Sequence, residues 1–257
     1  MVYVVSGKRV MSTASEAITA LRKLKVYDIS LTLDTNMPNW PGHPSMAIVR
    51  DARNFEQNGY FAQTLIMSEH TGSHVDAPAH AVRSMPQATI DTYPGDMLLA
   101  PYKKYDLIPY DYQAGESLDL ETIRTVEKKE GFSIEPGDII LLQFGWDKYY
   151  RPESKDMVDR IWWATNSPGL TEEACKYFAT SKIRAIGTDS LGCDAPFKDG
   201  VELGASVGHE KYFLPNHIFI MESLGKLREA PATGIFIAVP LKIKGGSGSP
   251  IRPILLA

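Results

Sequence analysis

Six short runs of β-branched, aromatic and other apolar residues punctuate the sequence, and Gly, Pro or Asp residues bound them. Runs of this length and composition predict β-strands. Helical patterns separate only some of them, so the strict strand–helix alternation of a doubly wound parallel sheet is missing. The chain therefore predicts a mixed α/β fold, with a mixed sheet or barrel and a few flanking helices. The six runs cover residues 26–33, 61–67, 139–144, 183–187, 217–221 and 235–241.

Three segments carry helical signals. In the first, apolar residues fall at helical spacing and Thr13 or Ser15 can cap the first turn. Asp119 is a possible cap for the second, and Thr171 opens the third directly after a Pro-Gly pair. The expected helices lie within residues 12–25, 118–130 and 171–179.

Residues 149–169 show neither pattern clearly and predict a long loop that carries Trp162 and Trp163. Loops of this length inside a domain are often functional. No Pro/Gly/Ser-rich linker divides the 257-residue chain, so a single domain is expected.

Composition narrows the class of protein. Apolar residues make up 44% and charged residues 23%, as in soluble globular proteins, and the net charge of −4 disfavours nucleic acid as a partner. No apolar run approaches the roughly 18 residues of a membrane span, and the N-terminus lacks the pattern of a signal peptide. Cys175 and Cys193 fit two plain thiols in a reducing compartment. We expect a cytoplasmic protein with no nucleic-acid or membrane partner.

Histidines cluster in one segment. Three of the chain's six, His70, His74 and His80, fall within eleven residues, where an even distribution would place fewer than one. Asp76 lies among them. Imidazole and carboxylate ligands together suit Zn²⁺, Mn²⁺ or Fe²⁺. The segment therefore predicts a metal site, although a polar turn with surface histidines gives the same pattern.

The segment's backbone is not expected to be helical, because Gly72 and Pro78 both disfavour a helix. At the end of a strand, His74 and Asp76 point to the same face because they are two residues apart. A turn at residues 71–72 can then bring His70 to the same point, so that one short segment supplies three ligands.

A second set of polar residues lies far along the chain. The apolar run 218–221 lies between His217 and Glu222, and His209 comes before it. A buried carboxylate is costly without a partner, and a metal or another cation would neutralise Glu222. A strand-end Glu that faces water fits the local pattern equally well.

Two other motifs are weaker. Residues 204–208 match the G-x-S-x-G elbow of serine hydrolases, but the preceding segment is polar and no Asp follows Ser206. The glycine- and serine-rich residues 245–250 lack the Lys of a phosphate-binding loop, so a flexible turn is the better interpretation.

The segment His70 to His80 resembles the H-x-G-T-H-x-D-x-P-x-H signature of the putative cyclase family, which includes bacterial kynurenine formamidase and isatin hydrolase. Ser73 stands in place of the signature Thr, and His43 stands in place of the Asp of the family's P-G-D-P turn. Blocks before and after this segment are also similar, so the resemblance extends over nearly the whole chain. They lie at residues 27–30, 37–44, 145–147, 168–170, 187–190, 222–224 and 239–241.

The resemblance implies a swivelling β/β/α domain over residues 26–257, after a helical extension over residues 1–25. It also implies a homodimer or homotetramer, in which the extension or the Trp40 turn packs on a neighbour. The metal ligands it implies are His70, His74 and Asp76 for one divalent ion, Zn²⁺ or Mn²⁺, and His209 and Glu222 for a second ion bridged by Asp76. In the same comparison His80 is the proton shuttle.

The activity implied is hydrolysis of a non-peptide amide bond in a small linear or cyclic, aromatic compound. Trp40, Phe61 and the Trp162–Trp163 pair are candidates for an aromatic wall around such a substrate, although core packing explains any one of them. A metal-dependent lyase, dehydratase or lactone hydrolase remains an alternative on the same site. So does a metal-stabilised binding protein, because a closed four-ligand site is structural whereas an open one is catalytic.

Overall fold

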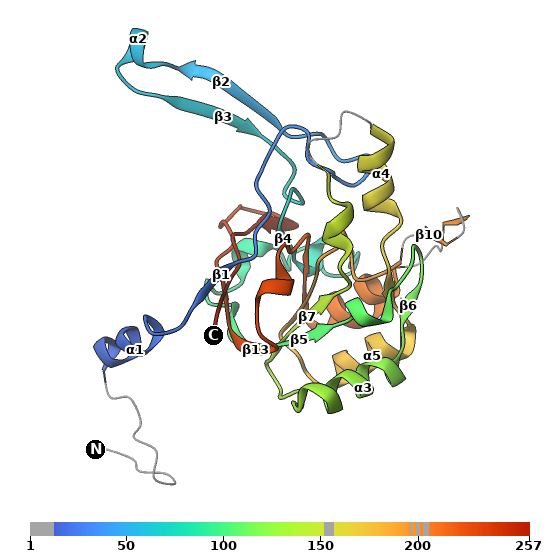
Figure 1. The fold of residues 1–257 in the computed structure, drawn as a ribbon. Helices are drawn as coiled ribbons and strands as arrows, with labels where there is room; N and C mark the ends of the chain where they lie inside the picture. Colours follow the sequence, from blue (N-terminus) through green and yellow to red (C-terminus); the bar gives the residue numbers. More distant parts are fainter. Residues whose placement is uncertain (1–12, 152–156, 196, 199–200, 203–205) are drawn as a thin grey trace.

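A curled mixed sheet forms the centre of the molecule in the computed structural model (Figure 1). The structure describes residues 13–151, 157–195, 197–198, 201–202 and 206–257. Within this part, nine strands pair in the order β1-β15-β13-β5-β7-β9-β12-β4-β14. In that order they are Val26–Asp28, Ile254–Leu256, Thr233–Ala238, Leu98–Asp106, Ile139–Gln143, Ala185–Thr188, Phe219–Glu222, His74–Asp76 and Gly248–Pro250.

The four central strands β5, β7, β9 and β12 run parallel, and the strands toward both edges pair antiparallel. All residues of β7 are buried, and its side chains alternate between the two faces. Ile140 and Leu142 join the core on one face, whereas Ile139 and Leu141 join the core on the other. The mixed α/β fold predicted from the strand runs is thus confirmed.

Helices α3 (Leu120–Glu130) and α5 (Glu172–Thr180) lie side by side on one face of the sheet (Figure 1). The Asp119 carboxylate accepts a hydrogen bond from the Thr122 backbone N–H at 2.8 Å, and the Thr171 hydroxyl caps α5 in the same way. The helix α1 (Ala14–Leu21) is capped by Thr13. All three predicted helices are therefore present in the described part of the chain.

A two-stranded ribbon of β2 (Ala47–Arg53) and β3 (Ala62–Ile66) projects from the body of the molecule, with the short helix α2 (Phe55–Asn58) at its tip (Figure 1). Two smaller pairs join β6 (Ser117–Leu118) to β8 (Gly169–Leu170) and β10 (Phe197–Lys198) to β11 (Val201–Glu202). The remaining short helical turns are Pro78–His80, Ile90–Thr92, Ile108–Tyr110, Trp146–Tyr149, Gly208–Phe213, Leu214–Asn216 and Leu227–Glu229.

The prediction of one long loop over residues 149–169 was wrong, because the helix α4 (Met157–Thr165) lies within this range. The indole N–H of Trp163 donates to the Trp146 carbonyl, and the indole N–H of Trp146 donates to the Trp163 carbonyl. Trp162 stacks on Trp146 at a ring distance of 5.4 Å. This packing anchors the segment to the core, so the Trp162–Trp163 pair is structural.

The strand β5 was absent from the expected set, because Pro101, Lys103 and Lys104 break its apolar pattern. Pro101 faces only β13, since pairing with β7 begins at Tyr102. The buried Lys104 ammonium donates to the carbonyls of Leu227 and Ala230. None of the helices in the described residues is long and apolar enough to cross a membrane.

Candidate metal centre

Strand pairing brings three polar side chains to one face at the end of the sheet. In the antiparallel pair of β4 and β12, His74 lies opposite Glu222, and Asp76 follows two residues after His74. Opposite residues of an antiparallel pair point to the same face, as do residues two apart. The Nε2 of His74 lies 3.5 Å from the Oδ1 of Asp76 and 3.3 Å from the Oε2 of Glu222. All three side chains are buried.

His209 enters the same group from the π-helical turn η5 (Gly208–Phe213). Its Nε2 lies 3.6 Å from the Oδ2 of Asp76 and 3.4 Å from the Oε1 of Glu222. The Asp194 carboxylate accepts hydrogen bonds from the His209 Nδ1–H at 2.7 Å and from the Gly208 backbone N–H at 2.7 Å. Asp194 therefore fixes both the turn and the ring that it carries.

His70 reaches the cluster through a turn, as the sequence predicts. Gly72 has a φ of +65°, and a Cβ at this position would lie 2.7 Å from a methyl group of Leu33. The turn places the Nδ1 of His70 2.6 Å from the Oδ1 of Asp76. The structure thus brings together all five residues that the resemblance implies as metal ligands.

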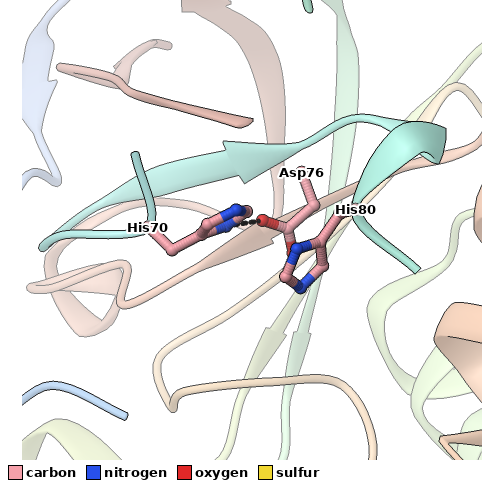
Figure 2. A group of neighbouring side chains, drawn as sticks. All are labelled: His70, Asp76 and His80. Atoms are coloured by element: carbon pink, nitrogen blue, oxygen red, sulfur yellow. Dashed lines mark hydrogen bonds and ion pairs between the residues drawn. The ribbon is translucent and has the colours of Figure 1, made fainter. Parts of the chain in front are cut away.

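His80 follows in a 3₁₀ turn, η1 (Pro78–His80), instead of continuing an extended strand. The turn folds the imidazole back, so that its ring centre lies 4.0 Å from that of His70 and 6.1 Å from that of His209. Figure 2 shows the rings of His70 and His80 on the two sides of the Asp76 carboxylate. Of these three side chains, that of His80 is the exposed one.

The charges of the cluster depend on one another. Burial lowers the pKa of His74, but the Asp76 and Glu222 carboxylates outweigh burial and raise it to about 9. Burial and Asp76 raise the pKa of Glu222, but its interactions with His209 and His74 lower it to about 2. His80 is exposed in part, but desolvation where its ring lines the cavity lowers its pKa. At neutral pH the metal-free cluster therefore holds carboxylates, a protonated His74 and a neutral His80.

One atom of the cluster indicates what the site can hold. The Oδ2 of Asp76 is buried and accepts no hydrogen bond among the residues that the structure describes. An unsatisfied buried carboxylate oxygen is costly. Ligand atoms of His70, Asp76 and His80, and separately of His74, Asp76 and Glu222, lie within 4.8 Å of one another. Imidazole nitrogens around two carboxylates fit one or two divalent ions such as Zn²⁺ or Mn²⁺.

Four residues of the cluster, all except Asp76, line a cavity of about 490 Å³. Trp40 and His43 form part of its wall, together with Leu191 and Ser206. Phe61 does not line this cavity. It directly precedes strand β3 of the projecting ribbon, and 54% of its surface is exposed. The structure therefore brings Trp40 to the site but does not bring Phe61 there.

Sequence reasoning missed two contributors to the site. His43 occupies the turn position noted as a departure from the family pattern, and its ring centre lies 5.7 Å from that of His70. Asp194 gave no signal of its own, because its partner His209 is fifteen residues away. His217, by contrast, lies outside the cluster and pairs with the hydroxyl of Tyr93 at 2.7 Å.

Comparisons with known proteins agree with this geometry. The model of the family described as Putative cyclase matches residues 27–195. An isatin hydrolase of Roseibium aggregatum is 32% identical over 197 residues, which cover 75% of this chain and 73% of the relative. A kynurenine formamidase of Erythrobacter litoralis is 27% identical over 235 residues, which cover 90% and 93%. A crystal structure of an isatin hydrolase bound to the product analogue thioisatinate matches with a TM-score of 0.83 at 26% identity, covering 96% of this chain and 99% of that one.

Proposed function

Because the chain belongs to the putative cyclase family, we propose that it is a metal-dependent hydrolase of a non-peptide C–N bond. Its substrate is a small linear or cyclic amide with an aromatic ring. The observation that carries this proposal is the five-residue cluster beside the cavity, with the buried and unsatisfied Oδ2 of Asp76 at its centre.

His70, His74 and Asp76 would hold one divalent ion, and His209 and Glu222 would hold a second beside Asp76. Zn²⁺ and Mn²⁺ both accept this mixture of imidazole and carboxylate ligands. A bound divalent ion lowers the pKa of water toward about 7 and polarises the amide carbonyl. The protein holds these ligands rigidly, because His74 and Asp76 lie on the buried strand β4 and Glu222 lies on the buried strand β12.

His80 moves the proton that the reaction requires. An amide nitrogen leaves poorly unless it gains a proton, so the site needs a group that can take and release one near neutral pH. The lowered pKa keeps His80 neutral at pH 7, and the ring stands at the cavity beside His70. His80 therefore accepts a proton from water and passes it to the leaving nitrogen.

Trp40 supplies an aromatic surface at the wall of the cavity, against which the ring of the substrate stacks. The relatives named for isatin and for kynurenine point to the same class of compound, an aromatic ring that carries an amide nitrogen.

We further propose a cytoplasmic homodimer or homotetramer. The buried Cys175 and Cys193 are free thiols, which suit a reducing compartment. The projecting ribbon exposes large apolar side chains, which a second copy would cover.

The test is activity against an N-aryl formamide and a cyclic aryl amide, measured with the metal content of the same preparation. Removal of the metal with a chelator is expected to abolish hydrolysis, and readdition to restore it. His74→Ala and Asp76→Asn are expected to lose both metal and activity. His217→Asn is the matched control, because it alters a histidine outside the cluster and keeps both. Full activity in a metal-free preparation would contradict the proposal.

A further inference from the structure

The hydroxyl of Ser247 lies between two side chains of the metal-binding segment. Its Oγ is 2.9 Å from the Nε2 of His70 and 2.8 Å from the Oε2 of Glu69. The Ser247 backbone N–H donates to the same carboxylate oxygen at 2.8 Å. Glu69, Ser247, His70 and Asp76 thus form one continuous chain of hydrogen bonds, in which His70 uses both ring nitrogens.

The direction of these bonds follows from what each group can donate. A carboxylate only accepts, so the single hydroxyl proton of Ser247 goes to Glu69. The Ser247 Oγ then presents lone pairs to His70, and it accepts from the Nε2–H. The 2.6 Å contact between Nδ1 and Asp76 is a hydrogen bond only while Nδ1 carries a proton, because a carboxylate cannot donate. A metal ion on Nδ1 takes the place of that proton, while Nε2 keeps its own.

We propose that Glu69 and Ser247 are positioning residues that select the tautomer of His70, so that this ligand binds the metal through Nδ1. The inference rests on the metal site of the proposed function. The partner of the second nitrogen commonly sets the tautomer and orientation of a metal-binding histidine.

The two other histidine ligands have the opposite arrangement. The Nδ1 of His74 is 2.8 Å from the carbonyl oxygen of Gly72, and the Nδ1 of His209 is 2.7 Å from the Asp194 carboxylate. Both rings therefore turn Nε2 toward the carboxylates of the cluster. His70 is the one ligand histidine of this set whose Nε2 is occupied by an outer partner.

The loop that carries Ser247 is fixed on both sides. The Ser247 carbonyl accepts the Ala77 N–H at 2.9 Å, and the Gly246 carbonyl accepts the Ile90 N–H at 2.8 Å. A Cβ on Gly248 would lie 2.7 Å from the Cε1 of His70, so the ring rests directly on the loop backbone. The glycine-rich residues 245–250, expected to be a flexible turn, instead continue into β14 and hold a metal ligand in place.

The experiment uses the full chain with Zn²⁺ as the probe. Protein labelled with ¹⁵N at histidine is loaded with zinc, and long-range ¹H–¹⁵N spectra identify the protonated and the metal-bound nitrogen of each ring. His70 is assigned from the signals lost in His70→Gln. We expect His70 to be bound through Nδ1 and protonated at Nε2, with His74 and His209 the reverse.

Zinc affinity is measured in parallel by competition with a chelator. Ser247→Ala is expected to weaken binding by about 10- to 100-fold, the usual effect of removing such a partner. Glu69→Ala is the second variant, because it removes the acceptor of the hydroxyl proton and leaves the hydroxyl free to donate to His70. It is expected to shift the His70 signals toward the other tautomer. Ser249→Ala is the matched control in the adjoining strand β14. Among the described residues the Ser249 hydroxyl bonds to Leu241 and Pro250 and not to the cluster, so this variant is expected to bind zinc as the unmodified protein does.

The outcomes separate the two proposals. Zinc binding through the Nε2 of His70, or unchanged affinity in Ser247→Ala, would overturn this inference and leave the proposed function standing. A chain that binds no zinc and no Mn²⁺ would overturn both.

Discussion

At the scale of single residues, His74 and His80 lie six positions apart but differ in pKa because their surroundings differ. His74 is buried between carboxylates that raise its pKa to about 9, whereas His80 stands at the cavity with a lowered pKa. Burial acts on both, but only His74 has two carboxylates close enough to outweigh it. The first is suited to binding a cation and the second to moving protons.

His80→Ala tests the second role. The substitution is expected to lower kcat by about 10²- to 10⁴-fold, the usual contribution of general acid–base catalysis. Bound metal should stay nearly unchanged, because all five proposed ligand side chains remain. Elemental analysis and steady-state kinetics on one preparation measure both. Loss of the metal would make His80 a ligand, and an unchanged kcat would remove it from the proton transfer.

His74 predicts how metal binding depends on pH. Below a pKa of about 9 the metal-free ring carries a proton, and coordination requires the neutral imidazole. Metal binding at pH 7 must therefore release a proton, and affinity should fall about tenfold per pH unit for each proton displaced as the pH is lowered. Calorimetry in two buffers of different ionisation enthalpy measures the number released. No release at pH 7 would show that His74 is neutral without the metal.

At the scale of elements, the site depends on how closely β14 packs against β4. Gly248 lies opposite Asp76, and a side chain there would meet both the His70 ring and the Val75 carbonyl at 2.7 Å. Backbone cannot yield as the end of a flexible side chain can. The edge strand therefore sets the position of the metal ligands as well as completing the sheet.

Gly248→Ala is expected to destabilise the fold by about 1–3 kcal/mol, as overpacking does, and to weaken metal binding because His70 must move. Gly95→Ala is the control, since a Cβ at that position meets nothing within 4 Å. Thermal unfolding with and without metal, together with chelator competition, compares the two variants. Equal metal affinity in both would mean that β14 does not constrain His70.

At the scale of the whole molecule, the projecting ribbon of β2 and β3 is the feature least explained by a single chain. Val49, Leu65 and Ile66 expose between 48% and 60% of their surfaces along it. An isolated two-stranded ribbon is marginally stable in water, so a stable arm needs cover for its apolar side chains.

We expect a dimer or larger assembly in light scattering at micromolar concentration. The double variant Val49→Lys and Leu65→Lys should shift the mass toward that of a monomer without changing the circular dichroism of the core. Val239→Lys, a still more exposed position outside the ribbon, should leave the mass unchanged. A monomeric unmodified chain would refute the expectation of a homo-oligomer.

Local sequence was enough to predict the helix caps, the mixed character of the sheet and the metal-binding segment. Asp119 and Thr171 cap helices through bonds to residues three positions away, and the turn that brings His70 beside Asp76 spans only six residues. Interactions this short leave a pattern that composition and spacing can reveal. The signature around His74 also sufficed to identify the family.

Only the tertiary structure decided which distant partners complete these features. Ser247 contacts His70 although 177 residues separate them in the sequence. Lys104 is buried because carbonyls more than 120 residues away accept its hydrogen bonds. Phe61 lies apart from the cavity because its ribbon projects from the body of the molecule. A hydrogen bond between distant segments imposes no spacing on the sequence, since any loop length that lets the strands pair will serve. The residues proposed as ligands therefore came from the local signature and from the family that it indicates, whereas their orientation and the shape of the cavity arose from the pairing of the sheet.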